Sequence, residues 1–348
     1  MQAIGRGKLA ALLGSLLLSA CGGGPPATPE PAPATASAAP STLVRPPATP
    51  GQLRDWLSVI AADSLEGRAT ATPGAARAAR LIAEAMHEMG LRPAGDSGFY
   101  QRVPLVRTGN GLSLADSLGG AEVTDVNVVG VLPGADSVLR HEAVVVGAHY
   151  DHVGVGAPLA GDSIYNGADD DGSGVIATLA IARALSSGPA PKRTIVFLLT
   201  TGEEVGLLGT RWYVAHPVVP LEHTVADLQI EMIGRPDPLV GGPGLAWLTG
   251  YERSTMGDMI KRAGLPIAPD PRPVQRLFER SDNIAFAMQG IPAHTLSSFG
   301  MHADYHQPAD EVSRIDFPHM ARVVDAAARL VRLLGNGPKP EWHAGGKP

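Results

Sequence analysis

Short, uninterrupted apolar runs alternate with longer helical stretches along most of this chain, and this alternation constrains the fold more than any other feature. The run at 195–199, Ile-Val-Phe-Leu-Leu, has no polar position on either side, which is typical of a strand buried on both faces. Strands that alternate with helices of about ten or more residues favour a parallel arrangement. We therefore predict an α/β fold with a mixed, mostly parallel central sheet flanked by helices on both faces.

The expected elements follow from hydrophobic periodicity and from local start and stop residues. A helix over 75–89 would end at Gly90, because glycine commonly follows the last turn of a helix. Further helices are predicted at 53–62, 172–185, 206–215, 255–263, 281–288 and 318–334, and strands at 126–132, 143–147, 193–199, 225–232 and 292–296.

The N-terminal segment has a different character. Basic residues precede an apolar stretch at 9–18, so we predict a signal peptide over residues 1–20. The string Leu-Ser-Ala-Cys that ends at Cys21 resembles a bacterial lipobox, and Cys21 is the only cysteine, which excludes an internal disulfide. We expect an exported protein, lipid-anchored through Cys21 in the bacterial cell envelope on the periplasmic side of the outer membrane. An ordinary signal peptide with a chance cysteine is the alternative.

Composition divides the rest of the chain. Residues 21–50 are mostly Gly, Pro, Ala, Ser and Thr and are predicted to form a disordered tether. Residues 51–336 are expected to form a single globular domain, and residues 337–348 a flexible C-terminal tail. The sequence holds 28 basic and 34 acidic side chains, and it has no basic stripe, which argues against a nucleic-acid partner. The membrane contact would be through Cys21 alone, and no pattern indicates an oligomeric state.

Side chains of the kinds that bind zinc follow several predicted strands and turns. They are His149, Asp170, Glu204, Glu231 and His306. Ligands of open α/β sheets bind beyond the carboxyl ends of the strands, so these side chains are expected to converge at one sheet edge. Three carboxylates, two Zn²⁺ and a bridging hydroxide would be neutral, whereas one ion would leave a costly negative cluster. The mixed ligands suit zinc and also admit Co²⁺ or Mn²⁺.

Each of these motifs has a plainer explanation when it stands alone. The acids at 169–171 also fit a solvated helix start, whereas a calcium loop needs alternating acids. The pair Glu203 and Glu204 also fits a solvated loop; if Glu204 binds metal, Glu203 is free to act as a general base. Asp151 follows His149 by two residues, so in extended backbone it would point the same way and hold the far imidazole nitrogen.

His152 is a weaker metal candidate, because in extended backbone it would point away from the side on which His149 lies. Two other histidines, His294 and His302, are expected to be bystanders. Aromatic and apolar residues near the last motif, namely Phe299, Met301 and Tyr305, fit either an apolar substrate pocket or an ordinary core.

Taken in order, the motifs resemble the M28 family of zinc metallopeptidases over about residues 55–335. They are His149-Tyr150-Asp151, the Gly-Ala-Asp-Asp-Asp-Gly-Ser-Gly string at 167–174, Glu203-Glu204, Ile230-Glu231-Met232 and Tyr305-His306. The resemblance implies the fold of zinc-dependent exopeptidases, also called phosphorylase/hydrolase-like, and two Zn²⁺ per chain. One departure is Asn283, where histidine is frequent in the family.

The resemblance also implies a role for each residue. Asp170 would bridge both metals, with His149 and Glu231 on one zinc and Glu204 and His306 on the other. Glu203 would be the general base for a metal-bridging water, and Asp151 would orient His149. A cis peptide between Asp170 and Asp171 is implied as well.

The expected function is hydrolysis of N-terminal residues from peptides by a di-zinc aminopeptidase. A carboxypeptidase or dipeptidase stays open, because Arg235 and Arg280 offer a cation for a substrate carboxylate. A glutaminyl cyclase with a single zinc is a second alternative on the same fold. A non-catalytic binding module is the third, although no ligand and no base is missing from the pattern.

Overall fold

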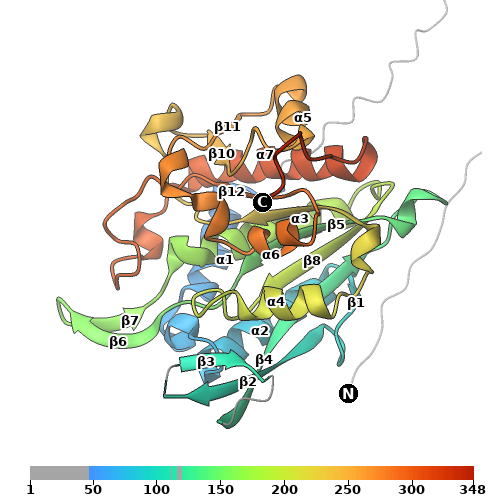
Figure 1. Ribbon diagram of the computed structural model, residues 1–348. Coiled ribbons are helices and arrows are strands. Elements are labelled where there is room, and N and C mark those ends of the chain that lie inside the picture. Colours follow the sequence, from blue (N-terminus) through green and yellow to red (C-terminus); the bar gives the residue numbers. More distant parts are fainter. Residues whose placement is uncertain (1–46, 110, 116–119) are drawn as a thin grey trace, which may run out of the picture. The chain divides into compact units, whose positions relative to one another are not determined.

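A ten-stranded mixed sheet lies at the centre of the computed structural model, which describes residues 47–109, 111–115 and 120–348 (Figure 1). In sheet order its strands are β11 (Ile267–Pro269), β10 (Ala246–Leu248), β12 (Ala293–Ser297), β9 (Thr224–Ile230), β5 (Ala143–His149), β8 (Thr194–Thr200), β4 (Ala121–Leu132), β2 (Tyr100–Thr108) and β3 (Gly111–Leu114), and β1 (Arg92–Pro93) pairs with β4. The four neighbours β12, β9, β5 and β8 are parallel, and most outer pairings are antiparallel. The predicted α/β class is confirmed, with the parallel strands concentrated in the middle of the sheet.

Helices pack on both faces of this sheet. They are α1 (Pro50–Ile60), α2 (Pro73–Glu88), α3 (Gly174–Ser186), α4 (Leu208–Ala215), α5 (Thr255–Ala263), α6 (Asn283–Met288) and α7 (Phe317–Asn336). Successive strand residues point to opposite faces, and β5 shows the consequence. Val144 and Val146 join a hydrophobic core with α1, α2, α3 and α7, whereas Val145 joins a second core with α4 and α6.

Local sequence accounts for where these elements begin and end. The Thr49 side chain accepts a hydrogen bond from the backbone N–H of Gln52, and the Gln52 side-chain oxygen accepts one from the backbone N–H of Thr49, so a capping box starts α1. Gly90 follows α2 with a φ of 73°, a left-handed conformation that glycine adopts without a steric penalty. Every residue of β5 and β8 is buried, as their continuous apolar runs predict.

Several elements differ from the prediction. The strands β1, β2, β3, β10 and β11 were not expected, nor was a separate hairpin of β6 (Gly154–Leu159) and β7 (Asp162–Tyr165). The flexibility predicted for residues 337–348 stays a prediction, and the structure describes contacts of this segment with the rest of the chain. Trp342 donates from its indole Nε1 to the backbone oxygen of Gly290 at 2.9 Å and packs against the Phe278 and His294 rings, because this large side chain finds a place beside the second core.

The predicted signal peptide, Cys21 and most of the predicted tether lie outside the described residues. Within the part of the chain that the structure does describe, no helix is both long and apolar enough to cross a bilayer.

Arg68 is a fully buried cation that ties several loops together near the carboxyl edge of the sheet. Its guanidinium donates to the backbone oxygens of Tyr150 at 2.7 Å, Ile60 at 2.8 Å, Asn166 at 2.6 Å and Gly167 at 3.0 Å. Carbonyl groups buried without a donor are destabilising, so this one side chain satisfies four polar groups at once.

We expect Arg68→Met to lower the free energy of unfolding by about 3 kcal/mol, because each buried group left unpaired costs about 1–3 kcal/mol. Methionine keeps most of the length of the side chain and removes every donor. Denaturant unfolding measures the effect, and Arg329→Met on the exposed side of α7 is the matched control, with an expected change within about 0.5 kcal/mol. Equal stability of the two variants would show that Arg68 is not a structural tie.

Candidate metal centre

The first group of candidate ligands gathers where the parallel strands end. His149 is the last residue of β5, Glu231 follows β9 directly, and Asp170 lies in the turn before α3. The Nε2 atom of His149 lies 3.3 Å from Oδ1 of Asp170. One ligand atom from each of these three residues lies within 4.8 Å of the others, so together they could hold one metal ion.

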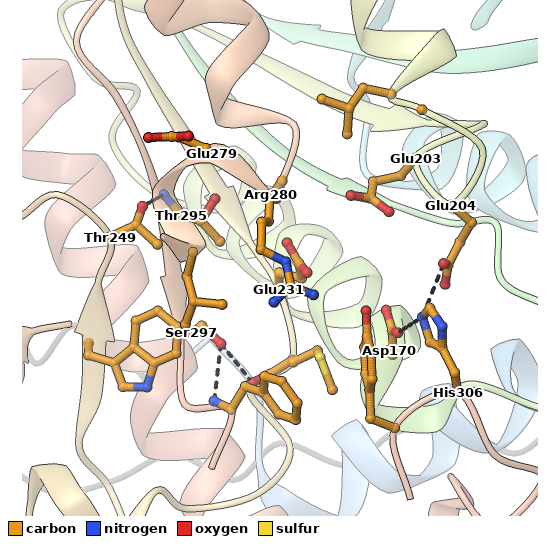
Figure 2. A pocket seen from close by; sticks show the side chains of 18 residues that line it. Asp170, Glu203, Glu204, Glu231, Thr249, Glu279, Arg280, Thr295, Ser297 and His306 are labelled. Carbon is orange, nitrogen blue, oxygen red and sulfur yellow. Dashed lines mark hydrogen bonds and ion pairs between the residues drawn. The ribbon is translucent and has the colours of Figure 1, made fainter. Parts of the chain in front are cut away.

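A second group lies on the other side of the same aspartate. The Nε2 atom of His306 is 3.1 Å from Oδ2 of Asp170 and 3.1 Å from Oε2 of Glu204 (Figure 2). His306 comes from the loop before α7, and Glu204 from the loop after β8. Asp170 belongs to both groups, with one carboxylate oxygen nearest to each imidazole. The structure therefore brings together all five residues that the sequence analysis selected as ligands.

His152 also joins the second group, which the sequence analysis did not expect. Its Nδ1 atom lies 2.8 Å from Oε1 of Glu204 and 3.8 Å from Oδ2 of Asp170. The alternation of side chains that made this residue a weaker candidate holds only in extended backbone, and β5 ends at His149. The available signal in the sequence was a second histidine three residues after the one that ends the strand.

The donor atoms of these groups are compatible with metal coordination. Among the described residues, the buried Nε2 atoms of His149 and His306 contact carboxylate oxygens at ion-pair distances without forming a hydrogen bond, and the buried Oε2 of Glu231 has no hydrogen-bond partner. Buried polar atoms are nearly always paired, so several unpaired atoms that face one another call for a ligand. Imidazole nitrogens and carboxylate oxygens are the donors that zinc takes in such sites, and the residues present fit this metal.

The pKa values of the side chains in the site also favour a bound cation. Burial raises the pKa of Glu231 to about 7 and raises the pKa of Glu203 well above its usual range. Burial disfavours a charge on His306, but Asp170 and Glu204 outweigh it and raise the pKa of His306 to about 10. The carboxylates therefore favour a positive charge on the half-buried imidazole of His306, and divalent cations would supply such charge directly.

The three consecutive aspartates have separate roles, which explains how they can stand side by side. Asp169 accepts a hydrogen bond from the backbone N–H of Gly234 at 2.7 Å, and Asp171 accepts one from the N–H of Met232 at 3.0 Å. Both therefore hold the segment that follows Glu231, and only Asp170 is left to face the candidate ligands. The peptide between Asp170 and Asp171 is cis, as the resemblance implied.

Asp151 makes different contacts from those expected. The Nδ1 atom of His149 lies 3.1 Å from the backbone oxygen of Asp151, whereas the Asp151 carboxylate is 3.8 Å away. That carboxylate instead accepts hydrogen bonds from the Thr70 hydroxyl at 2.8 Å and from the backbone N–H of Glu203 at 3.2 Å. Asp151 thus orients His149 through its carbonyl group and the Glu203 loop through its side chain.

Glu203 lines the site without joining either ligand group. Figure 2 shows its carboxylate beside that of Glu204, facing the same cavity. Its side chain makes no hydrogen bond or ion pair with any other described residue, so it is free to exchange a proton with a bound molecule.

Arg235 is not available to a substrate, although the sequence offered it as a cation. Its guanidinium lies 2.7 Å from the Asp304 carboxylate and 3.2 Å from that of Asp310. Asp310 in turn accepts hydrogen bonds from the backbone N–H groups of Asp169 and Asp170. Arg235 therefore joins the turn that carries Asp170 to the loop that carries His306.

Two expected bystanders lie away from both ligand groups. His302 contacts Asp169, with 3.0 Å between its Nε2 and the carboxylate. His294 lies within β12, where its Nδ1 is 2.7 Å from the Thr249 backbone oxygen and its Nε2 is 2.7 Å from the Ser254 hydroxyl. Burial lowers the pKa of His294 to about 4, so this ring is neutral in the folded protein at neutral pH.

His294 should make the protein less stable in mild acid. Below pH about 6.5 the unfolded chain takes up a proton on this ring while the folded chain does not, so the free energy of unfolding falls until pH about 4. We expect a loss of about 3 kcal/mol from this residue across that window. Unfolding measured from pH 7 to pH 4 should show a smaller loss in His294→Gln and an unchanged loss in the exposed-site control His223→Gln. Identical pH profiles of the three proteins would contradict the assignment.

Comparison with known proteins agrees with this geometry. The profile of peptidase family M28 matches residues 127–331. A protein of Aspergillus oryzae named probable leucine aminopeptidase 2 is 32% identical over 175 residues, which are 49% of this chain and 33% of that protein. The chain spans less than half the length of the curated relatives it matches.

Solved structures show the same fold. The chain is similar to BSAP, a zinc aminopeptidase from Bacillus subtilis, with a TM-score of 0.61 and 16% identity over 83% of this chain and 95% of that chain. It is also similar to the glutaminyl cyclase of Porphyromonas gingivalis, with a TM-score of 0.57 and 14% identity over 81% and 97% of the two chains. At these identities the likeness extends to the fold alone.

Proposed function

The chain belongs to peptidase family M28, and from that premise we propose that it is a zinc-dependent aminopeptidase that holds two metal ions and removes single residues from the N-termini of peptides. The observation that carries the proposal is the position of Asp170 between two groups of candidate ligands. A carboxylate shared in this way supports a pair of ions, since each group has further donors of its own.

The residues fall into two sets around that carboxylate. His149, Glu231 and Asp170 would hold one ion, and Glu204, His306 and Asp170 the other, with His152 beside Glu204. When bound, zinc would supply Lewis-acid polarisation of the scissile carbonyl and acidification of water. Asp169 and Asp171 would keep Glu231 facing Asp170 through their hydrogen bonds to the backbone that follows it.

Glu203 is the proposed general base. Its high pKa, a consequence of burial, suits a carboxylate that must take a proton from water and then release it. Its free side chain can pass that proton to the nitrogen of the leaving amine. The hydrogen bond from the Glu203 N–H to Asp151 holds the loop in place while this transfer occurs.

The cavity favours the end of a peptide over its middle. It encloses about 350 Å³ and is lined by Asp170, Glu203, Glu204, Glu231 and His306 together with residues of β10 and β12. This volume is at the small end of ligand pockets, which suits one terminal residue better than an extended chain. The name of the Aspergillus oryzae relative supports the N-terminal direction.

Metal content and turnover test the proposal together. Mass spectrometry of the purified protein should show two zinc ions per chain, and aminoacyl-nitroanilides should be hydrolysed with a rate that a chelator abolishes. One zinc per chain, combined with ring closure of peptides that begin with glutamine, would instead establish a cyclase. Metal binding without turnover of either substrate class would leave a binding module as the function.

A further inference from the structure

One basic side chain in the cavity has no partner. Arg280 lines the cavity just before α6, and Figure 2 shows its side chain pointing into the pocket on the side of Glu231. Its guanidinium makes no hydrogen bond or ion pair with any residue that the structure describes. Arg235, the other cation considered for this site, is fully engaged by Asp304 and Asp310.

The acidic residues around Arg280 pair with another residue or belong to the candidate metal ligands. Glu279 precedes it in the chain and forms an ion pair with Arg276. Asp170 and Glu231 belong to the groups of candidate metal ligands. An arginine that faces these ligands is left without an anion once divalent cations have neutralised them, so its free positive charge is directed to whatever occupies the cavity.

Arg280 is exposed to solvent, so water hydrates its guanidinium when no substrate is bound. Among the groups that a peptide could bring into the cavity, a carboxylate is the acceptor that arginine binds most strongly, because the guanidinium can donate two parallel N–H bonds to its two oxygens.

We propose that Arg280 binds a carboxylate of the substrate and so selects substrates that carry one close to the scissile bond. This inference rests on the proposed peptidase function. The carboxylate has two sources in peptides: the side chain of an N-terminal Asp or Glu, or the C-terminal carboxylate of a dipeptide. Both place an anion within a few bonds of the cleaved amide, and both are recognised by the same fork of N–H donors.

Two substrate pairs separate these sources in the zinc-loaded protein. Glutamyl-nitroanilide against leucyl-nitroanilide tests the side chain, and alanyl-leucine against alanyl-leucinamide tests the terminal carboxylate. For each pair, the measured quantity is kcat/KM of the charged substrate divided by kcat/KM of the neutral substrate. In Arg280→Met we expect this ratio to fall about 10-fold or more for one of the two pairs, because the variant loses a hydrogen bond to a charged group. Arg280→Lys should retain part of the ratio, because it keeps the charge and loses the fork.

The matched control is Arg262→Met on the exposed surface of α5, which should leave both ratios at the wild-type value. Calorimetric titration with glutamate and glutamine gives a second readout that needs no turnover, and Arg280→Met should weaken glutamate selectively if the side-chain source is correct. Ratios unchanged in Arg280→Met for both substrate pairs would overturn the inference while leaving the peptidase function intact. Absence of turnover of all four substrates by the wild-type protein would refute the proposed function instead.

Discussion

Glu203→Gln is expected to keep both metal ions and to lower kcat by about 1,000-fold, within the range that a positioned general base contributes. Glutamine has nearly the shape of glutamate but cannot take a proton from water. Glu203 lies outside both groups of candidate ligands, and its contact with Asp151 uses the backbone N–H, which the substitution preserves. The loss should therefore appear in turnover and leave metal content unchanged.

Steady-state kinetics beside metal analysis measures this result. Glu222→Gln, an exposed residue outside the cavity, is the matched control and should keep wild-type kcat. Turnover within about threefold of wild type in Glu203→Gln would show that another group moves the proton, since a general base contributes at least about 100-fold. Loss of metal together with turnover would show that Glu203 is a ligand.

Asp170→Ala is expected to weaken binding of both metal ions by at least about 100-fold and to abolish turnover, because removal of even an outer partner of a ligand costs about 10–100-fold in metal affinity. The reason is its shared position: its carboxylate lies 3.3 Å from His149 Nε2 and 3.1 Å from His306 Nε2. Glu204→Ala and Glu231→Ala should each weaken one ion and spare most of the binding of the other.

Titration of metal-free protein with zinc distinguishes these cases by stoichiometry. Asp55→Ala, on the exposed side of α1, should bind zinc like the wild type. Retention of one tightly bound ion in Asp170→Ala would show that the carboxylate does not serve both groups. Circular dichroism should show native secondary structure in every variant, so that lost binding is not confused with unfolding.

Much of the sheet was predictable because its central strands are continuous apolar runs in the sequence. The run at 195–199 is apolar throughout, and the structure places it in β8 with every residue buried. The outer strands lack such a signal. β2 contains Pro104, a residue that usually marks an edge strand or no strand at all, and its alternation fails at Val106. β10 has only three residues, and its pairing with β12 and β11 decides its conformation.

In the candidate site, too, the residues at strand ends were predictable and the contacts between loops were not. Placement of His149, Glu204 and Glu231 beyond strand ends was enough to predict that they would meet, since parallel strands end at one edge. The contacts between loops were not predictable in this way. Arg235 pairs with Asp304 and Asp310, which are 69 and 75 residues further along the chain. No local pattern distinguishes it from Arg280, which has no such partner.

The spread of the ligands along the chain sets the time at which the centre can form during synthesis. His149 and Asp170 emerge early, but His306 comes from the last loop before α7, and α7 packs against α1 from the other end of the described chain. Domains fold as the chain is made, from the N-terminus onward. A growing chain therefore lacks a complete set of candidate ligands until His306 has been synthesised, and any activity that depends on all of them is delayed until then.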